Sequence, residues 1–176
     1  SLDDVAQLSG IDRSSVYYYI SSKKDLFYEV VGESIERTTE KATEIASGPG
    51  DPMSKLTDLM VTLMQSYEEN YPHLYVFLQE DVGKIKSANI NKLVKTAERF
   101  DTAVRQMVQE GMDLGILRSD IPKTIVAHAL VGMANWSHRW FKPGGDNSAA
   151  EIGAFFAKMA LQGLVQRPSE TDNQGR

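Results

Sequence analysis

The sequence predicts an all-α protein, and three observations lead to this fold class. Apolar residues recur at spacings of three and four along most of the 176-residue chain. Ser and Asp residues that can cap helices precede these segments, and no segment alternates in the manner of a β-strand. Because 41% of the residues are hydrophobic, the chain can bury a sizeable core.

Capping and breaking residues set the expected helix ends in the first half of the chain. Ser1 and Asp12 each precede a short apolar segment, and Ser22 opens a long amphipathic one. The Gly- and Pro-rich run 47–52 ends the long helix, and Pro72 breaks the helix that follows. The expected helices span about 2–8, 13–18, 23–46, from that loop to 70, and 74–82.

Three longer helices are expected in the second half. Residues 89–113 show a regular amphipathic pattern, and Pro122 suits the first turn of a helix that runs to about 141. A Gly-rich turn over 142–147 precedes the last helix, which is expected to end at about 165. The polar tail 167–176 is expected to be disordered.

Composition excludes several classes of protein. The absence of cysteine excludes disulfide scaffolds, thiolate metal sites and thiol nucleophiles. No apolar run approaches the roughly 20 residues of a membrane helix, and no charged and apolar leader opens the chain, so a cytoplasmic protein is expected. The formal net charge of −5 argues mildly against nucleic-acid binding, for which a basic surface is typical.

The second short helix has an unusual composition for a core helix. It reads Arg13-Ser14-Ser15-Val16-Tyr17-Tyr18-Tyr19-Ile20, and its three consecutive tyrosines cannot all face one core. Hydroxyl groups and arginine can contact phosphates and base edges. Two short helices joined at Gly10 fit a helix-turn-helix, whose second helix would enter the major groove. The composition equally allows a Tyr-rich packing corner between helices.

These residues resemble the signature of the tetracycline-repressor (TetR) family. The matching residues are Val5-Ala6, Ser9-Gly10-Ile11 and the run from Ser14 to Leu26, with Tyr19 and Ile20 in place of the usual His and Phe. The resemblance implies a DNA-binding role for Arg13, Ser14, Ser15, Tyr17, Tyr18 and Lys23. The family's first helix is absent from this sequence, so the resemblance implies an incomplete DNA-binding domain.

Two C-terminal helices are too apolar to be covered within one subunit. Residues 125–136 contain no charge, and residues 152–165 carry one narrow polar stripe. Small residues recur every four positions at Ala149, Gly153 and Ala157, which would let another helix approach closely. We expect a two-fold dimer, with a buried hairpin inside one subunit as the alternative. The expected interface residues are Ile125, Ala129, Met133, Gly153, Phe156, Ala157, Ala160 and Leu164.

The middle helices carry many Met and aromatic residues, which suit an adaptable apolar pocket. Each of these residues could equally belong to an ordinary core. Arg139 could hold an anionic group or lie in solvent, and the run 135–145 resembles TetR repressors of fatty-acid and steroid breakdown, which sense acyl-CoA thioesters. The expected ligand contacts are Met64, Tyr67, Phe77, Phe100, Val104, Met107, Trp136 and Arg139.

An enzyme is not expected, because the three histidines lack metal-type spacing and no nucleophile–base pair is visible. No metal or cofactor is expected. The sequence therefore predicts a helix-turn-helix domain with its connecting helix over 1–46 and a ligand-binding and dimerisation domain over 52–166. The expected function is a dimeric transcriptional repressor that binds a palindromic operator and is released by a small hydrophobic or acyl-CoA-type inducer. A multidrug-sensing repressor of an efflux gene and a helical binding protein without DNA binding are the alternatives.

Overall fold

The computed structural model describes residues 1–79 and 90–165, apart from the side chains of Phe77 and Ile90. Its regular elements in this part are helical, and one isolated antiparallel bridge joins Leu117 to Val165. The predicted all-α class is confirmed. The helices are α1 (Leu2–Ser9), α2 (Arg13–Tyr19), α3 (Lys23–Ser47), α4 (Pro52–Glu69), α5 (His73–Leu78), α6 (Ile90–Asp113), α7 (Lys123–Trp136), the 3₁₀ turn η2 (Ser137–Arg139) and α8 (Ala149–Leu164).

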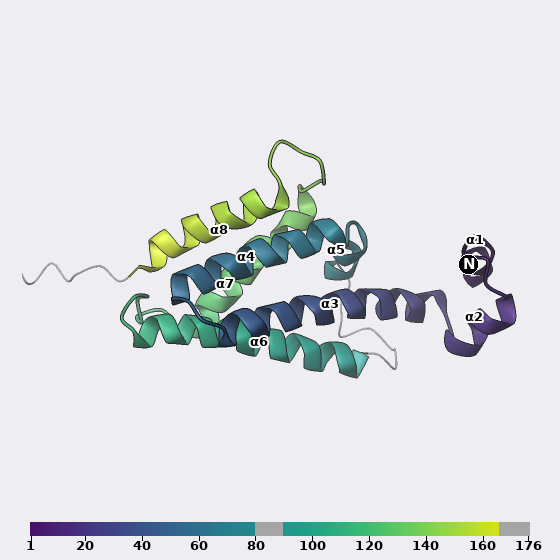
Figure 1. The fold of residues 1–176 in the computed structure, drawn as a ribbon, viewed down its shortest axis with the longest axis horizontal. Coiled ribbons are helices and arrows are strands. Elements are labelled where there is room, and N and C mark those ends of the chain that lie inside the picture. The colour runs from purple at the N-terminus through teal and green to yellow at the C-terminus, as the bar shows by residue number, and fades with distance from the viewer. Residues whose placement is uncertain (80–89, 166–176) are drawn as a thin grey trace, which may run out of the picture.

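The helices form a body with a small two-helix unit at one end (Figure 1). Helix α4 is central in the body, because it packs against α3, α6, α7 and α8. Helices α3 and α6 lie along one side, and α8 lies on the far side of α4. The side chains of Leu56, Leu59, Met60 and Met64 on α4 are fully buried and form the centre of the core.

Side-chain caps begin five of the helices, which explains why the sequence folds this way locally. Ser1, Asp12, Ser22, Asp51 and Ser148 each accept a hydrogen bond from a backbone N–H in the first helical turn. Hydrogen bonds from a neighbouring serine hydroxyl and from backbone N–H groups lower the pKa of the Asp12 and Asp51 carboxyls. These carboxylates therefore stay ionised and stabilise the positive ends of their helices.

Two expected helices differ from the structure. The helix predicted to reach 141 ends at Trp136, because the chain tightens into η2 and Phe141 donates its N–H to the carbonyl of Ser137 at 2.8 Å. This turn places Phe141 in the core rather than on a helix surface. The helix predicted over 74–82 is observed over His73–Leu78, and the predicted part beyond 79 lies outside the described residues, as does the tail 167–176.

A buried lysine joins three helices of the body through an ion pair and a hydrogen bond to a carbonyl. The ammonium of Lys55 on α4 lies 2.9 Å from Glu110 of α6 and 3.3 Å from the carbonyl oxygen of Ala46 in α3. Only 6% of Lys55 is exposed, so its charge depends on these two partners for stabilisation. This contact holds the C-terminal end of α3 in place. No helix in the described part is long and apolar enough to cross a membrane.

The stripe of small residues on α8 faces α4 of the same subunit, which corrects the prediction that Gly153 and Ala157 lie between subunits. Both residues are buried within the single chain. A Cβ at Gly153 would stand 2.6 Å from the carbonyl oxygen of Met60 and from the Cα of Val61. The close approach that the spacing predicts is therefore present, but its partner is α4.

Candidate functional sites

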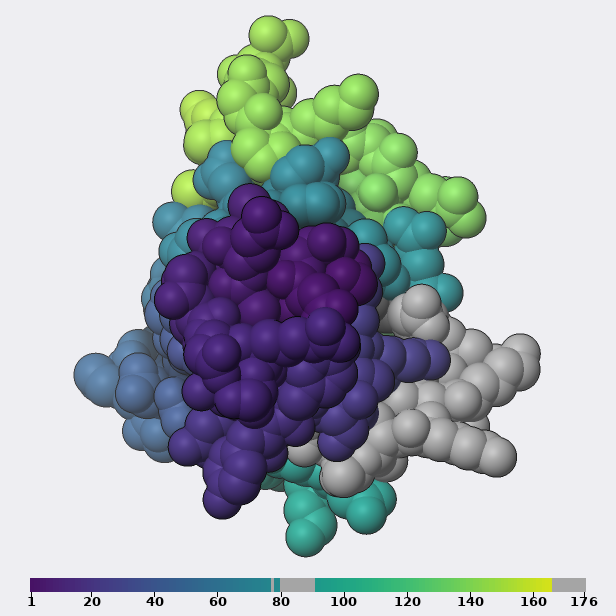
Figure 2. Space-filling view, turned by 90° about the vertical axis from the view of Figure 1, so that its right-hand side faces the viewer, coloured from purple at the N-terminus to yellow at the C-terminus, as the bar shows by residue number. Residues whose placement is uncertain are grey.

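The two-helix unit has the geometry of a helix-turn-helix. Gly10 adopts φ 65°, a left-handed conformation that glycine tolerates, and ends α1 where the chain turns into α2. Helices α1 and α2 pack against each other, and neither packs extensively against α4 to α8 in the described part of the chain. Figure 2 looks onto this end, where the unit stands in front of the helical body.

Helix α2 presents its tyrosines to solvent. No residue of α2 is buried, and Tyr18 and Tyr19 are 81% and 80% exposed. Their rings contact each other edge to face at 4.9 Å, and Tyr17 is 46% exposed. This exposure does not fit a Tyr-rich packing corner within the described residues. It leaves three amphipathic side chains on the surface of one short helix.

The charged and hydroxyl residues expected at the DNA interface differ in the contacts that they make within the protein. Arg13 pairs with Asp3 at 2.8 Å and lies over the ring of Tyr17 at 5.4 Å. The hydroxyl and backbone N–H of Ser14 and the backbone N–H of Ser15 donate to Asp12. Lys23 begins α3 and is exposed. The serines therefore support the cap of α2 and Arg13 is paired, while the exposed tyrosines and Lys23 make no ion pair or cap contact in the described part.

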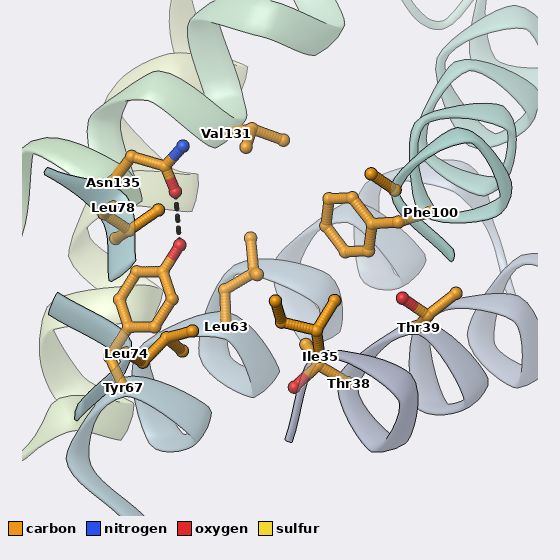
Figure 3. Close-up of a pocket in the computed structure, with 11 residues that line it drawn as sticks. Ile35, Thr38, Thr39, Leu63, Tyr67, Leu74, Leu78, Phe100, Val131 and Asn135 are labelled. Atoms are coloured by element: carbon orange, nitrogen blue, oxygen red, sulfur yellow. Dashed lines mark hydrogen bonds between the residues drawn. The ribbon is translucent and has the colours of Figure 1, made fainter. Parts of the chain in front are cut away.

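An apolar cavity of about 210 Å³ lies between α3, α4, α5, α6 and α7 (Figure 3). The lining residues in the described part of the chain contain no carboxylate or amine. Burial raises the pKa of the Tyr67 hydroxyl, so this phenol remains neutral and donates a hydrogen bond to Asn135 Oδ1. The lining residues are Ile35, Thr38, Thr39, Leu63, Tyr67, Leu74, Leu78, Ala97, Phe100, Val131 and Asn135.

The structure brings together only part of the expected ligand contacts. Tyr67 and Phe100 line the cavity. Met64, Val104 and Met107 are fully buried in the core and are not among the described residues that line this cavity, so their role as ligand contacts stays a prediction.

Two further expected ligand contacts lie on the surface. Trp136 is 61% exposed with Arg139 stacked on it at 5.6 Å, so both lie on the surface and outside the cavity. The side chain of Phe77 lies outside the described part.

Sequence reasoning missed the residues that the long helix contributes to the cavity. Ile35, Thr38 and Thr39 lie on the face of α3 that turns inward, together with the buried Ala42. Thr39 is 1% exposed, and a polar residue at a core position of an amphipathic helix is the signal that could have identified it. Asn135, the residue before the last one of α7, is a half-buried polar residue in an otherwise apolar segment and carries a similar signal.

Helices α7 and α8 pack against each other, and both expose apolar side chains. Ile125 and Trp136 on α7 are 57% and 61% exposed, and Phe155 and Met159 on α8 are 51% and 60% exposed. Ala129 is exposed between the two α7 residues. Of the other expected interface residues, Met133, Phe156, Ala160 and Leu164 are half-buried. Side chains of this kind in one region are typical of a protein interface.

A two-helix DNA-reading unit, carried on a long helix that enters a helical body with an apolar cavity, defines a helix-turn-helix transcriptional regulator. Residues 49–164 match the family model described as "Tetracyclin repressor-like, C-terminal domain". The chain therefore belongs to the tetracycline-repressor (TetR) family.

Similar proteins agree with this class. The transcriptional repressor KstR2 of Mycolicibacterium smegmatis is 25% identical over 93% of this chain and 80% of its own length. The transcriptional regulator AcrR of Shigella flexneri is 33% identical over 77% of this chain and 68% of its own length. The solved structure of AibR with isovaleryl coenzyme A and operator DNA has a TM-score of 0.74 at 15% identity, over 90% of this chain and 85% of AibR, and so shares the fold.

Proposed function

We propose that this chain is a dimeric transcriptional repressor that binds a palindromic operator and is released by a small apolar or acyl-CoA-type inducer. Within this proposal, residues 1–46 bind DNA, and residues 52–166 sense the ligand and dimerise. The exposed tyrosines of α2 support DNA binding, and the cavity supports ligand binding. AibR, which shares the fold, was solved with an acyl-CoA thioester and its operator, and this supports the class of inducer.

One observation carries the proposal: helix α3 lines the cavity and is also the helix that follows the DNA-reading unit. Ile35, Thr38 and Thr39 line the cavity, and the same helix begins at Lys23, directly after α2 and its connecting turn. A ligand that favours one position of α3 therefore also favours one position of the recognition helix. The two binding events are then coupled by a free energy, and each changes the affinity of the other.

DNA binding by α2 is tested with Tyr18→Ala, because Tyr18 is exposed and touches only Tyr19 among the ring contacts of α2. We expect Tyr18→Ala to weaken binding to DNA from upstream of the protein's own gene by at least about tenfold in a gel shift, the effect of losing about 1.4 kcal/mol. The matched control is Tyr71→Ala, which removes an exposed tyrosine from the turn before α5. Equal binding by Tyr18→Ala and wild type would contradict the assignment.

Dimerisation is tested on the apolar surface of α7 and α8. Ala129→Glu places a charge in the middle of this surface and is expected to yield monomers in sedimentation at micromolar concentration, because a charge buried at an interface is costly. Val94→Glu is the control, because Val94 is an exposed apolar residue on α6, away from that surface. Unchanged dimers of Ala129→Glu would show that this surface is not the interface.

Ligand release is tested with isovaleryl coenzyme A as the probe. We expect this thioester to raise the unfolding temperature of the protein and to release it from DNA. If neither this thioester nor any other raises the unfolding temperature or releases the protein from DNA, the acyl-CoA class of inducer is excluded. A repressor of an efflux gene remains the alternative, and release of DNA by a cationic drug instead of a thioester would favour it.

A further inference from the structure

One hydroxyl in the cavity has no hydrogen-bond partner among the residues that the structure describes. Thr39 Oγ1 is buried and unpaired, and the residue is 1% exposed. Its neighbours on α3 behave differently, because Thr38 and Thr43 donate to the carbonyl oxygens four residues earlier at 2.9 and 2.8 Å. Figure 3 shows the Thr39 hydroxyl turned toward the space beside Phe100.

The other hydroxyls at the cavity are occupied. Tyr67 donates to Asn135, and Thr38 bonds to Ser66 at 2.6 Å as well as to its own helix. An unpaired O–H in an apolar site loses a hydrogen bond that it would make in water. Thr39 therefore needs an acceptor that the described protein atoms do not supply, and a ligand oxygen in the cavity would supply it.

The lining and the volume of the cavity also limit the charge and the size of a ligand group that can be buried in it. Ile35, Leu63, Leu74 and Phe100 are among its walls, and among the residues that the structure describes no lining side chain carries a charge that could stabilise an ion. An ionised carboxylate or ammonium would lose its hydration there without compensation. A dry protein cavity of about 150 Å³ holds benzene, so one of about 210 Å³ holds roughly six to nine heavy atoms.

We propose that the cavity selects an uncharged group of about this size whose carbonyl oxygen accepts a hydrogen bond from Thr39 Oγ1. This inference rests on the proposed function, because it names the chemistry of the inducer's buried part. A thioester carbonyl or a ketone meets the requirement, and a free carboxylate or a cationic amine does not. The rest of a larger ligand extends past Ala97, the exposed residue at the rim.

The test compares three probes built on one ring, cyclohexanone, cyclohexanecarboxylate and cyclohexylammonium, against wild type, Thr39→Val and Thr43→Val. Valine matches the shape of threonine and removes only the hydroxyl. Thr43 lies one turn further along α3, is exposed and serves as the control. Binding is measured by calorimetry, and unfolding temperature is measured without ligand.

We expect wild type to bind cyclohexanone more tightly than either charged probe. Thr39→Val should weaken cyclohexanone binding about three- to tenfold, the effect of one neutral hydrogen bond, and Thr43→Val should not. Without ligand, Thr39→Val should unfold at the same temperature as wild type or higher, since it removes an unpaired polar group. Thr43→Val should unfold at a lower temperature, because its hydroxyl bond is lost.

Three results would overturn the inference: cyclohexanone binding unchanged in Thr39→Val, a charged probe that binds as tightly as cyclohexanone, or no binding of any probe. The proposed function is measured separately, by release of DNA with isovaleryl coenzyme A. Release that is equal in wild type and Thr39→Val refutes the role of Thr39 and leaves the repressor function standing. Thr39-dependent binding of cyclohexanone in a protein that does not bind DNA supports the inference and refutes the repressor function.

Discussion

Replacing Gly153 by alanine should destabilise this protein, although the same change stabilises most helices. Alanine in place of a mid-helix glycine usually raises the free energy of unfolding by about 0.5–1 kcal/mol, because it lowers the backbone entropy of the unfolded chain. At Gly153 the new Cβ would stand 2.6 Å from the Met60 oxygen and the Val61 Cα, which are backbone atoms and cannot rotate away. Overpacking of this kind costs about 1–3 kcal/mol. Because the clash is with backbone atoms, we place its cost at about 2–3 kcal/mol within that range. After a gain of about 1 kcal/mol from backbone entropy, the expected net loss is about 1–2 kcal/mol.

Urea unfolding followed by helical circular dichroism measures this difference. A loss of about 1–2 kcal/mol corresponds to an unfolding temperature lower by about 2–8 °C for a chain of this size. The matched control is Gly163→Ala in the same helix, where nothing lies within 4 Å of the added Cβ, so this variant should be as stable as wild type or more stable. If Gly153→Ala gains stability as Gly163→Ala does, the close contact between α4 and α8 is wrong.

Three further changes test other parts of the molecule. Lys23→Ala should weaken operator binding and reduce the slope of log affinity against log salt by about one, if Lys23 contacts phosphate; an unchanged slope in a salt titration would exclude that contact. Glu110→Gln should lower the free energy of unfolding by about 1–3 kcal/mol in urea, because the buried Lys55 ammonium loses its counter-charge. Hydrogen bonds from Thr96 and Arg99 lower the pKa of Glu36 from its ordinary value of 4.5, so its stabilisation is complete above 4.5 and is lost as pH falls below it. Glu36→Gln should therefore lose less stability than wild type between about pH 5 and pH 3, and parallel pH curves would contradict this.

The sequence was sufficient for the fold class and for the family because both depend on local signals. The capping residues Ser1, Asp12 and Ser22 lie next to the segments they begin, and the helix-turn-helix residues are contiguous. Helix ends that depend on tertiary contacts were harder to predict from the sequence. The last turn of α7 gives way to η2 so that Phe141 reaches the core, and no residue before Phe141 signals this.

The candidate sites were only partly predictable. The spacing of apolar residues predicts that one face of a helix is buried, but it does not identify the helix that packs against that face. Gly153 and Ala157 marked a close helix contact correctly, but α4 of the same chain makes it. Similarly, Met64 and Met107 have the side-chain chemistry of a pocket wall and are fully buried, but they do not line the apolar cavity. Whether an apolar side chain borders a cavity depends on the packing of five helices, which no single segment encodes.

The attachment of the DNA-reading unit by one helix gives it a long lever arm. Lys23 lies sixteen residues before Thr39, a distance of about 24 Å along an α-helix. A tilt of α3 by about 8° at Thr39 moves its first residue by about 3.4 Å, which is the rise of one base pair. Small angular changes in the body therefore become register changes on DNA. Substitutions where α3 rests on α6, far from any base, should alter operator affinity as much as substitutions in α2.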